Sequence, residues 1–330
     1  MDNTVNTAFQ KSIFDEYLPI YVHSLGIEKV LDFDLYVFNG REMVLFRSSS
    51  LEFTAKTRDL LLNENIHRLY ISRADRKRYQ QHIRSRINQI LTDKSIDDFT
   101  KASIVYDSAK ELVENVFSDP TKSENIQESR EFVESTVLYV LEGANAFHNM
   151  LRVMSFDYSL YSHSVNVCTF SLALAAVAGV DRTVELIELG TGALLHDVGK
   201  VKIPDNILYK PGPLSVEEWD LVRQHPQHGV DIISETDMIP EMSYVPIKQH
   251  HERQDGSGYP DNLEHKDIHI YSSIVAIADV FDAMTTRRVY RQEQSSYSSL
   301  REMFDQHGAF DRRLLEIFTQ LMGPTTLGGL

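Results

Sequence analysis

An apolar helical pattern that ends in a histidine and an aspartate is the feature that most restricts what this chain can fold into. The stretch reads Ala193-Leu194-Leu195-His196-Asp197-Val198-Gly199-Lys200. Its apolar residues predict a buried helix, and the glycine marks the helix end. An imidazole and a carboxylate are thereby held side by side at a rigid helix end, which is how a metal site begins.

Further potential ligands lie far away along the chain, so the fold must bring them together if they act together. They are His163, His225, His250, His251 and Asp279. One histidine on an apolar helix is more often a core residue than a ligand, but five histidines and two aspartates in one region favour a metal centre. Consecutive histidines on a helix point about 100° apart, which suits two ions better than one.

Seven such groups are enough for two metal ions if Asp197 bridges them. Imidazole with carboxylate suits iron, manganese, zinc or nickel. Cys168 is the only cysteine, which argues against a closed structural zinc site and excludes an internal disulfide. A single cysteine also fits a reducing compartment.

Composition limits the class of protein further. A length of 330 residues suggests two domains, and 42% hydrophobic residues can fill a core in each. The formal net charge of −15 argues against a surface that binds duplex nucleic acid. The first residues lack the pattern of a signal peptide, and the apolar stretch 165–180 is shorter than the roughly 20 residues of a membrane-spanning helix. We therefore expect a cytoplasmic protein without membrane insertion.

Residues 1–92 are predicted to form a small α+β module. Asn39-Gly40 separates two strand-like stretches, 34–38 and 42–46, and this pair of residues is typical of a tight hairpin turn. A helix near 54–62, a strand at 67–72 and a helix over 74–91 should follow. Because no catalytic set of residues occurs here, we expect a regulatory role or the binding of a protein partner.

Residues 93–147 are predicted to form a helical connector, interrupted at Ser118-Asp119-Pro120 because proline cannot continue a helix. Its exposed amphipathic helix is of a kind that can carry a homodimer contact, and the sequence leaves that open. Residues 148–330 read as all helix. The predicted helices cover 162–178, 183–196, 216–235, 244–252, 272–285, 295–306 and 312–322.

Two motifs carry a family resemblance. The first is His196-Asp197-Val198-Gly199-Lys200, and the second is His250-His251-Glu252-Arg253-Gln254-Asp255-Gly256-Ser257-Gly258-Tyr259-Pro260. Together they resemble the signatures of the HD-GYP family, a branch of the HD-domain metal-dependent phosphohydrolases. The resemblance covers about Tyr161 to Phe310. It implies an all-α HD-type helical domain after the α+β module, and hydrolysis of cyclic di-GMP to the linear dinucleotide or GMP.

The resemblance also implies how the ligands divide between two metal ions. One ion would take His163, His196, Asp197 and Asp279, and the second would take His225, His250 and His251, with Asp197 as the bridge. The family uses iron, or manganese, in centres of two or three ions. The three-ion branch has an extra glutamate where this chain has Asp157-Tyr158-Ser159-Leu160, so we expect two divalent ions, with iron first and manganese second.

The expected catalytic groups are Asp197 and Lys200. Two cations would hold a bridging hydroxide in line with the scissile phosphorus, and Lys200 would donate to that hydroxide or to a phosphate oxygen. A surface lysine at a helix end is the plainer alternative. The resemblance places Arg288 and Arg291 on the substrate side, where guanidinium groups suit phosphate, with Lys210 as a weaker substrate contact.

The second motif also contains residues expected to shape a loop rather than to react. They are Asp255, Gly256, Gly258, Tyr259 and Pro260. Glycine allows tight backbone geometry, proline fixes φ, and an aspartate can hold loop amides or Arg253. Tyr259 as a general acid is the less favoured reading. Asp282, one turn after Asp279, is expected to support a ligand or pack a helix rather than to bind metal.

Four positions beside the expected pocket depart from the family pattern. Gln254 replaces an aromatic residue or histidine, Glu264 a glycine, His269 a proline and Ser273 an arginine. Because the ligand set is intact, these departures suggest an alternative function, namely a metal-containing cyclic-dinucleotide sensor with little or no turnover that acts through protein partners. A nucleotidase acting on a mononucleotide is a third reading, which the Gly-Tyr-Pro segment disfavours.

Overall fold

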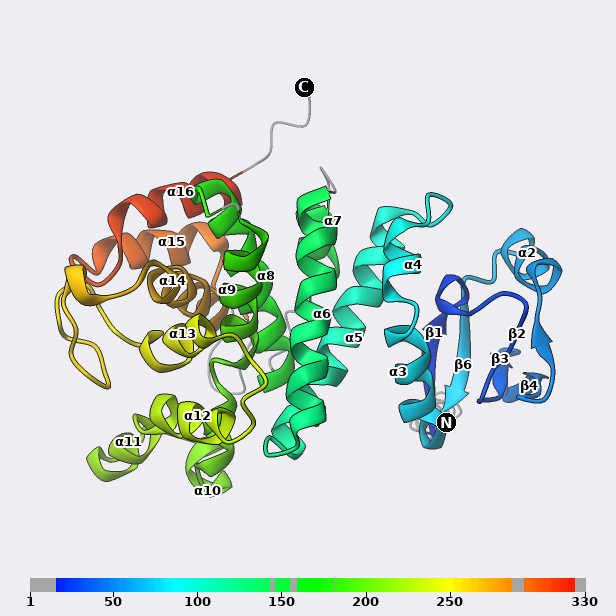
Figure 1. Cartoon of the computed structure of the whole chain (residues 1–330), viewed down its shortest axis with the longest axis horizontal. Helices are drawn as coiled ribbons and strands as arrows, with labels where there is room; N and C mark the ends of the chain where they lie inside the picture. The colour runs from blue at the N-terminus through cyan, green and yellow to red at the C-terminus, as the bar shows by residue number, and fades with distance from the viewer. Residues whose placement is uncertain (1–15, 143–145, 155–158, 181, 287–293, 324–330) are drawn as a thin grey trace, which may run out of the picture. The chain divides into compact units, whose positions relative to one another are not determined.

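The computed structural model describes residues 16–142, 146–154, 159–180, 182–286 and 294–323 (Figure 1). The chain divides into two compact units, residues 1–108 and 109–330, and the division falls within helix α5 (Asp98–Ser118). The predicted fold class is confirmed, because a small sheet-containing unit precedes a helical unit.

The first unit is built on a four-stranded antiparallel sheet in the order β1-β6-β3-β4. Its strands are β1 (Tyr17–Tyr21), β3 (Leu35–Phe38), β4 (Met43–Arg47) and β6 (Arg68–Ser72), and a separate pair joins β2 (Lys29–Val30) to β5 (Glu52–Phe53). The predicted hairpin is confirmed between β3 and β4. There Gly40 has a φ of 93°, and the side-chain oxygen of Asn39 accepts bonds from the amides of Arg41 and Glu42.

The helices of this unit are α2 (Ala55–Asn63), α3 (Arg76–Arg84) and α4 (Ile87–Thr92). The single helix expected over 74–91 is wrong, because the chain leaves helical geometry at Arg86, where φ is −126° and ψ is −1°. The Arg86 guanidinium donates to the carbonyl of Ser24, so this side chain is used for a tertiary contact. The core contains Phe33, Phe53, Leu69 and Ile71.

Among the described residues of the second unit, the regular elements are helices. Its helices are α6 (Ser123–Glu142), α7 (Ala146–Val153), α8 (Leu160–Ala178), α9 (Thr183–Leu195), α10 (Asp205–Leu208), α11 (Val216–Val222), α12 (His225–Ser234), α13 (Tyr244–Gln249), α14 (Ile270–Thr285), α15 (Ser296–Asp305) and α16 (Arg312–Met322). Short 3-10 helices are η3 (Val198–Lys202), η4 (Glu241–Ser243) and η5 (His265–Asp267). The predicted break after Ser118 is confirmed.

The expectation of one helix over residues 216–235 is wrong, and the difference matters for the site. The chain forms α11 and α12 with a break between Val222 and His225. Pro226 occupies the first turn of α12, where its missing amide costs nothing, but it cannot continue a helix that arrives from α11. The break places His225 at the beginning of a helix instead of in the middle of one.

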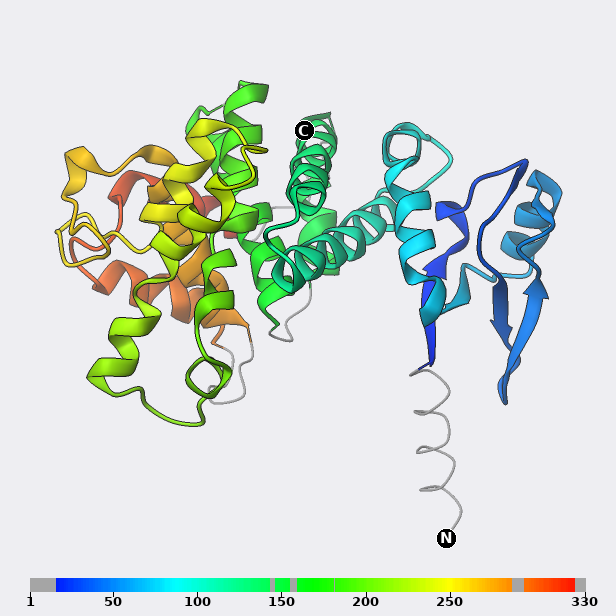
Figure 2. The ribbon, with the colours of Figure 1, turned by 60° about the horizontal axis from the view of Figure 1, so that its bottom comes forward.

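The core of the second unit is centred on α8, which packs against α9 and α14, as both views of the ribbon show (Figure 1, Figure 2). Phe170, Phe281 and Phe318 meet edge to face at 5.0–5.8 Å between ring centroids. Among the described residues, α8 is the one helix long and apolar enough to cross a membrane. However, 83% of that window is buried inside the unit.

Close packing of backbone positions the turn that follows α9. A Cβ at Gly199 would lie 1.9 Å from the carbonyl oxygen of His225 and 2.5 Å from the amide nitrogen of Gly229. Only glycine therefore lets η3 lie directly on α12. Leu195, Val198 and Ile247 fill the apolar cluster beneath this contact.

Candidate metal centre

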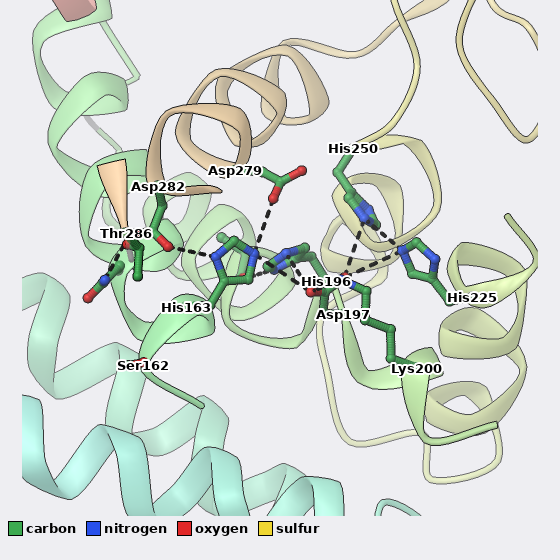
Figure 3. A network of polar contacts seen from close by, with 12 residues as sticks. Ser162, His163, His196, Asp197, Lys200, His225, His250, Asp279, Asp282 and Thr286 are labelled. Atoms are coloured by element: carbon green, nitrogen blue, oxygen red, sulfur yellow. Dashed lines mark hydrogen bonds and ion pairs between the residues drawn. The ribbon is translucent and has the colours of Figure 1, made fainter. Parts of the chain in front are cut away.

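The seven predicted ligands converge, although they come from five segments of the chain. Figure 3 labels all of them except His251. α8 carries His163, the end of α9 carries His196 and Asp197, and α12 begins at His225. His250 and His251 end α13, and Asp279 lies within α14. Four of the five segments contribute at or near a helix end, where several side chains can reach one point.

The first group consists of His163, His196 and Asp279, whose candidate ligand atoms lie within 4.8 Å of one another. The Nε2 atom of His163 is 3.1 Å from Oδ1 of Asp279 and 3.7 Å from Oδ2 of Asp197. The Nε2 atom of His196 is 3.5 Å from the same Oδ2. One oxygen of Asp197 therefore faces this group.

The second group consists of Asp197, His225, His250 and His251, again within 4.8 Å. Here the other oxygen of Asp197 is turned toward the histidines. Its Oδ1 atom is 3.4 Å from Nε2 of His225 and 3.9 Å from Nε2 of His250. Because its two oxygens face different groups, Asp197 is the carboxylate that the two groups share.

Backbone carbonyls fix the protonation of three of these rings. The Nδ1 atoms of His196 and His225 lie 2.8 and 2.7 Å from the carbonyls of Ala193 and Val222, and Nδ1 of His250 lies 3.0 Å from that of Ile247. A carbonyl only accepts, so each Nδ1 carries the proton and donates it. Each Nε2 then presents a lone pair to the centre of the site.

Among the residues that the structure describes, these lone pairs have no protein donor to meet. The Nε2 atoms of His225 and His250 lie 3.2 Å apart. Nε2 of His196 and Oδ1 of Asp197 are buried without a hydrogen-bond partner. Buried acceptors that face one another are unfavourable unless a cation lies among them. The residues present therefore fit a bound metal.

A carboxylate behind His163 orients its ring. The Nδ1 atom of His163 lies 2.7 Å from Oδ2 of Asp282, which is 2% exposed. The other oxygen of Asp282 accepts bonds from Asn166 and Thr286, at 2.8 and 3.1 Å (Figure 3). Asp279 and Asp282 are three residues apart on α14, so both carboxylates lie on one helix face and flank the imidazole.

The electrostatics of the site keep four of the histidines neutral and the two aspartates charged. Burial lowers the pKa values of His196, His250 and His251, and it lowers the pKa of His225 from 6.5 to about 4. Burial alone would raise the pKa of Asp197, but the charge of Lys200 holds that pKa well below its usual range. Neutral imidazole and ionised carboxylate are the forms that bind metal.

Lys200 lies at the shared carboxylate, with its Nζ atom 2.5 Å from Oδ2 of Asp197. The Lys200 side chain is 16% exposed, whereas the aspartate is 1% exposed, so the lysine stands between the buried cluster and solvent. Lys210 instead bonds both carboxylate oxygens of Glu218, at 2.6 and 2.8 Å, and the structure does not bring it to the ligands. Arg288 and Arg291 lie outside the described residues.

The loop after His251 brings the predicted loop-shaping residues beside the ligands. The Tyr259 ring stacks on the His251 ring, with centroids 4.7 Å apart and planes at 28°. Asp255 accepts bonds from the amide and hydroxyl of Ser257, so it holds a loop amide rather than Arg253. Gly256 has a φ of 75°, which favours glycine, and Pro260 follows a cis peptide bond.

Sequence reasoning gave no role to two features of this loop. Glu252 is 2% exposed, and its carboxylate accepts bonds from the amides of Asp261 and Leu263. Gln254 and Ser273, two of the positions that depart from the family pattern, bond to each other at 2.9 Å. The position of Glu252 directly after two histidines was the sequence signal that could have identified it. Its hydrogen-bond partners are backbone amides, however, and a sequence motif does not show such partners.

Comparisons with known proteins agree with this geometry. A family model described as HD domain matches residues 155–314. The cyclic di-GMP phosphodiesterase PA4108 of Pseudomonas aeruginosa is 32% identical over 71% of this chain and 57% of its own length. The 3'3'-cGAMP-specific phosphodiesterase 2 of Vibrio cholerae is 29% identical over 73% of this chain and 49% of its own length. This chain thus spans about half the length of these relatives.

A solved structure supports the fold. It is Bd1817 of Bdellovibrio bacteriovorus, described as an HDGYP protein, which matches 93% of this chain and 99% of its own with a TM-score of 0.64 and 23% identity. At that identity the likeness shows the fold alone. The family model covers the region that holds both signature motifs. Residues 155–314 therefore resemble the HD domain, and the predicted resemblance to the HD-GYP family is confirmed by this match and by the names of the relatives.

Proposed function

We propose that the second unit is a metal-dependent phosphodiesterase that hydrolyses cyclic di-GMP to the linear dinucleotide or GMP. The observation that carries this proposal is the buried Asp197 carboxylate, whose two oxygens face two groups of histidines. The names of the relatives, which act on cyclic dinucleotides, support the substrate class.

We further propose that the centre holds two divalent ions, with iron first and manganese second. His163, His196 and Asp279 would hold one ion, and His225, His250 and His251 the other, with Asp197 shared. Mixed imidazole and carboxylate donors suit both metals. When bound, such a pair supplies positive charge to the phosphoryl oxygens and lowers the pKa of a water that it holds.

The chain's own residues prepare the site for that chemistry. Lys200 donates from Nζ to Oδ2 of the shared carboxylate, and the same side chain would meet a phosphate oxygen at the solvent side of the cluster. Backbone carbonyls and Asp282 fix four of the five imidazoles, which limits reorganisation when substrate binds. Arg288 and Arg291 remain proposed substrate contacts. Lys210 would first have to leave Glu218.

The alternative is a metal-containing cyclic-dinucleotide sensor that binds without appreciable turnover. The observation in its favour is the hydrogen bond between Gln254 and Ser273, because both of these side chains are uncharged. An arginine at the serine position would place a cation there. Loss of that charge beside the pocket would weaken the electrostatic stabilisation of a phosphoryl transition state while leaving the metal ligands in place.

Other expectations stay predictions. They are the division into residues 1–92, 93–147 and 148–330, a protein partner for the first of these segments, a homodimer contact, and a cytoplasmic location. The regulatory role of residues 1–92 also stays a prediction.

Turnover and metal content measured on one sample test the proposed function. Protein loaded anaerobically with iron should contain about two ions per chain and convert cyclic di-GMP to linear product. Asp197→Ala should lose at least one ion and lower turnover by about 100-fold or more, because the shared ligand is gone. Asp220→Ala, whose side chain is 64% exposed, is the matched control. Two ions with no hydrolysis would favour the sensor, and retention of both ions in Asp197→Ala would refute the shared ligand.

The carboxylate behind His163 generates a second prediction. Asp282→Asn keeps one oxygen acceptor but puts an amide group against either His163 Nδ1 or the Asn166 amide, both of which donate to Asp282 in the native site. Affinity for one of two Mn²⁺ ions should fall by about 10- to 100-fold in a calorimetric titration. Asp305→Asn, on the exposed end of α15, should leave both affinities unchanged. Equal affinities in the two variants would contradict the orienting role.

The buried histidines predict a pH dependence for the metal-free protein. His225 has a pKa of about 4 in the folded chain against 6.5 for an ordinary histidine, so the unfolded chain takes up its proton first as pH falls. Stability should therefore decline from about pH 6.5 to about pH 4. The difference of about 2.5 between the two pKa values, at about 1.4 kcal/mol for each unit, corresponds to a loss of about 3–4 kcal/mol.

Urea unfolding of the metal-free protein at pH 7 and at pH 4.5 measures this loss. His225→Gln should reduce the difference between the two pH values, because the titrating group is absent. His307→Gln removes an exposed histidine and should leave the difference unchanged. An identical pH dependence in both variants would show that His225 is not held neutral by folding.

A further inference from the structure

One of the five histidines proposed as metal ligands, His251, is held differently from the other four. His163, His196, His225 and His250 each use Nδ1 in a hydrogen bond to a carboxylate or a carbonyl. Among the described residues, neither ring nitrogen of His251 makes a hydrogen bond, and its nearest charged neighbour is Oδ2 of Asp279, 3.8 Å from Nδ1. Its side chain is 18% exposed, whereas those of the other histidines are 0–1% exposed.

Ring packing replaces the missing hydrogen bond. Tyr259 stacks on one face of the His251 ring, at 4.7 Å between centroids, and its amide donates to the His251 carbonyl at 3.2 Å. His250 lies 4.1 Å away by the same measure and His225 lies 5.0 Å away. His251 is therefore confined between the other histidines and Tyr259, so its orientation depends on where the loop holds that tyrosine.

The loop that carries Tyr259 is closed by a buried carboxylate. Oε1 of Glu252 accepts a bond from the amide of Asp261 at 2.7 Å, and Oε2 accepts one from the amide of Leu263 at 2.9 Å. Between these amides Asn262 adopts a left-handed conformation, with a φ of 54°, and its side chain donates to the carbonyl of Gly258. Charged acceptors make stronger hydrogen bonds to amides than neutral acceptors do. The Glu252 carboxylate therefore holds the end of this loop strongly.

The return of the loop to Glu252 leaves no room for a side chain. A Cβ at Gly258 would lie 2.5 Å from the Cα of Glu252 and 2.4 Å from the amide nitrogen of Arg253. Glu252 thus holds the segment on both sides of Tyr259, by backbone packing before it and by two hydrogen bonds after it. Glu252 is also adjacent in sequence to His251, so one short segment contains both the ligand and the residue that closes its cover.

We infer that Glu252 is a positioning residue for the second metal ion, acting through Tyr259 on His251. This inference rests on the proposed two-ion centre. Without the carboxylate the loop opens, the Tyr259 ring leaves His251, and the imidazole is free to turn away from Asp197, His225 and His250. The first group, His163, His196 and Asp279, is anchored elsewhere and keeps its ion. The two ions therefore differ in how much they depend on the loop.

Titration of the metal-free protein with Mn²⁺, followed by calorimetry and electron paramagnetic resonance, tests this inference. Glu252→Gln places an amide group against one of the two backbone N–H donors, so it should lower the affinity for one ion by about tenfold or more. The affinity for the other ion should stay within about twofold. When Mn²⁺ fills only the tighter site of Glu252→Gln, the electron paramagnetic resonance spectrum should be that of an isolated ion instead of a coupled pair.

Variants of the loop separate positioning from general stability. Tyr259→Ala should reproduce the loss at one ion, and Tyr259→Phe, which keeps the ring, should restore native affinity. Glu235→Gln makes the same chemical change at an exposed position outside the loop and should have no effect. Equal weakening of both ions in Glu252→Gln, or native affinity for both, would overturn the inference while leaving the two-ion centre standing. Failure of the native protein to bind Mn²⁺ would overturn the proposed function and the inference together.

Discussion

The structure of the second unit depends on which groups accept hydrogen bonds from three imidazole N–H groups. His196, His225 and His250 donate their Nδ1 protons to backbone carbonyls three residues earlier in the chain, so three Nε2 lone pairs meet around the Asp197 carboxylate in a buried space. Such a cluster of acceptors opposes folding unless a cation compensates for it. The centre of this unit is therefore held in a form that favours metal binding, at some expense to the metal-free chain.

The arrangement of the helices brings the Nε2 atoms of these histidines together around Asp197. His196, His225 and His250 lie at the first or last turn of a helix, where the bond from Nδ1 reaches a carbonyl three residues earlier. The close contact at Gly199 lets the end of α9 approach α12, and α8 and α14 supply His163 and Asp279 from the core. The loop of Glu252 and Tyr259 completes the site at its exposed side. The rigid and the adjustable parts of the centre thus belong to different segments.

Much of this arrangement could be predicted from the sequence, because it follows from residue types and their spacing. The histidine and aspartate pattern, the hairpin at Asn39-Gly40 and the order of the helices needed no coordinates. The break before Pro226 was predictable and was missed, because helical apolar spacing continued through it. The contact between His163 and Asp282 joins residues 119 positions apart, and the partners of Glu252 are backbone amides. The spacing from Asp279 predicted that Asp282 supports a ligand or packs a helix, but no sequence pattern identifies His163 as its partner or backbone amides as the partners of Glu252. Both contacts had to be seen in the fold.

The most direct test of the central claim is a crystal structure of the iron-loaded protein, with anomalous scattering measured at the iron edge. The account predicts two anomalous peaks. One should lie among His163, His196 and Asp279 and the other among His225, His250 and His251, with one oxygen of Asp197 turned to each. A single peak, or two peaks that do not share Asp197, would contradict the claim that this carboxylate joins two metal sites.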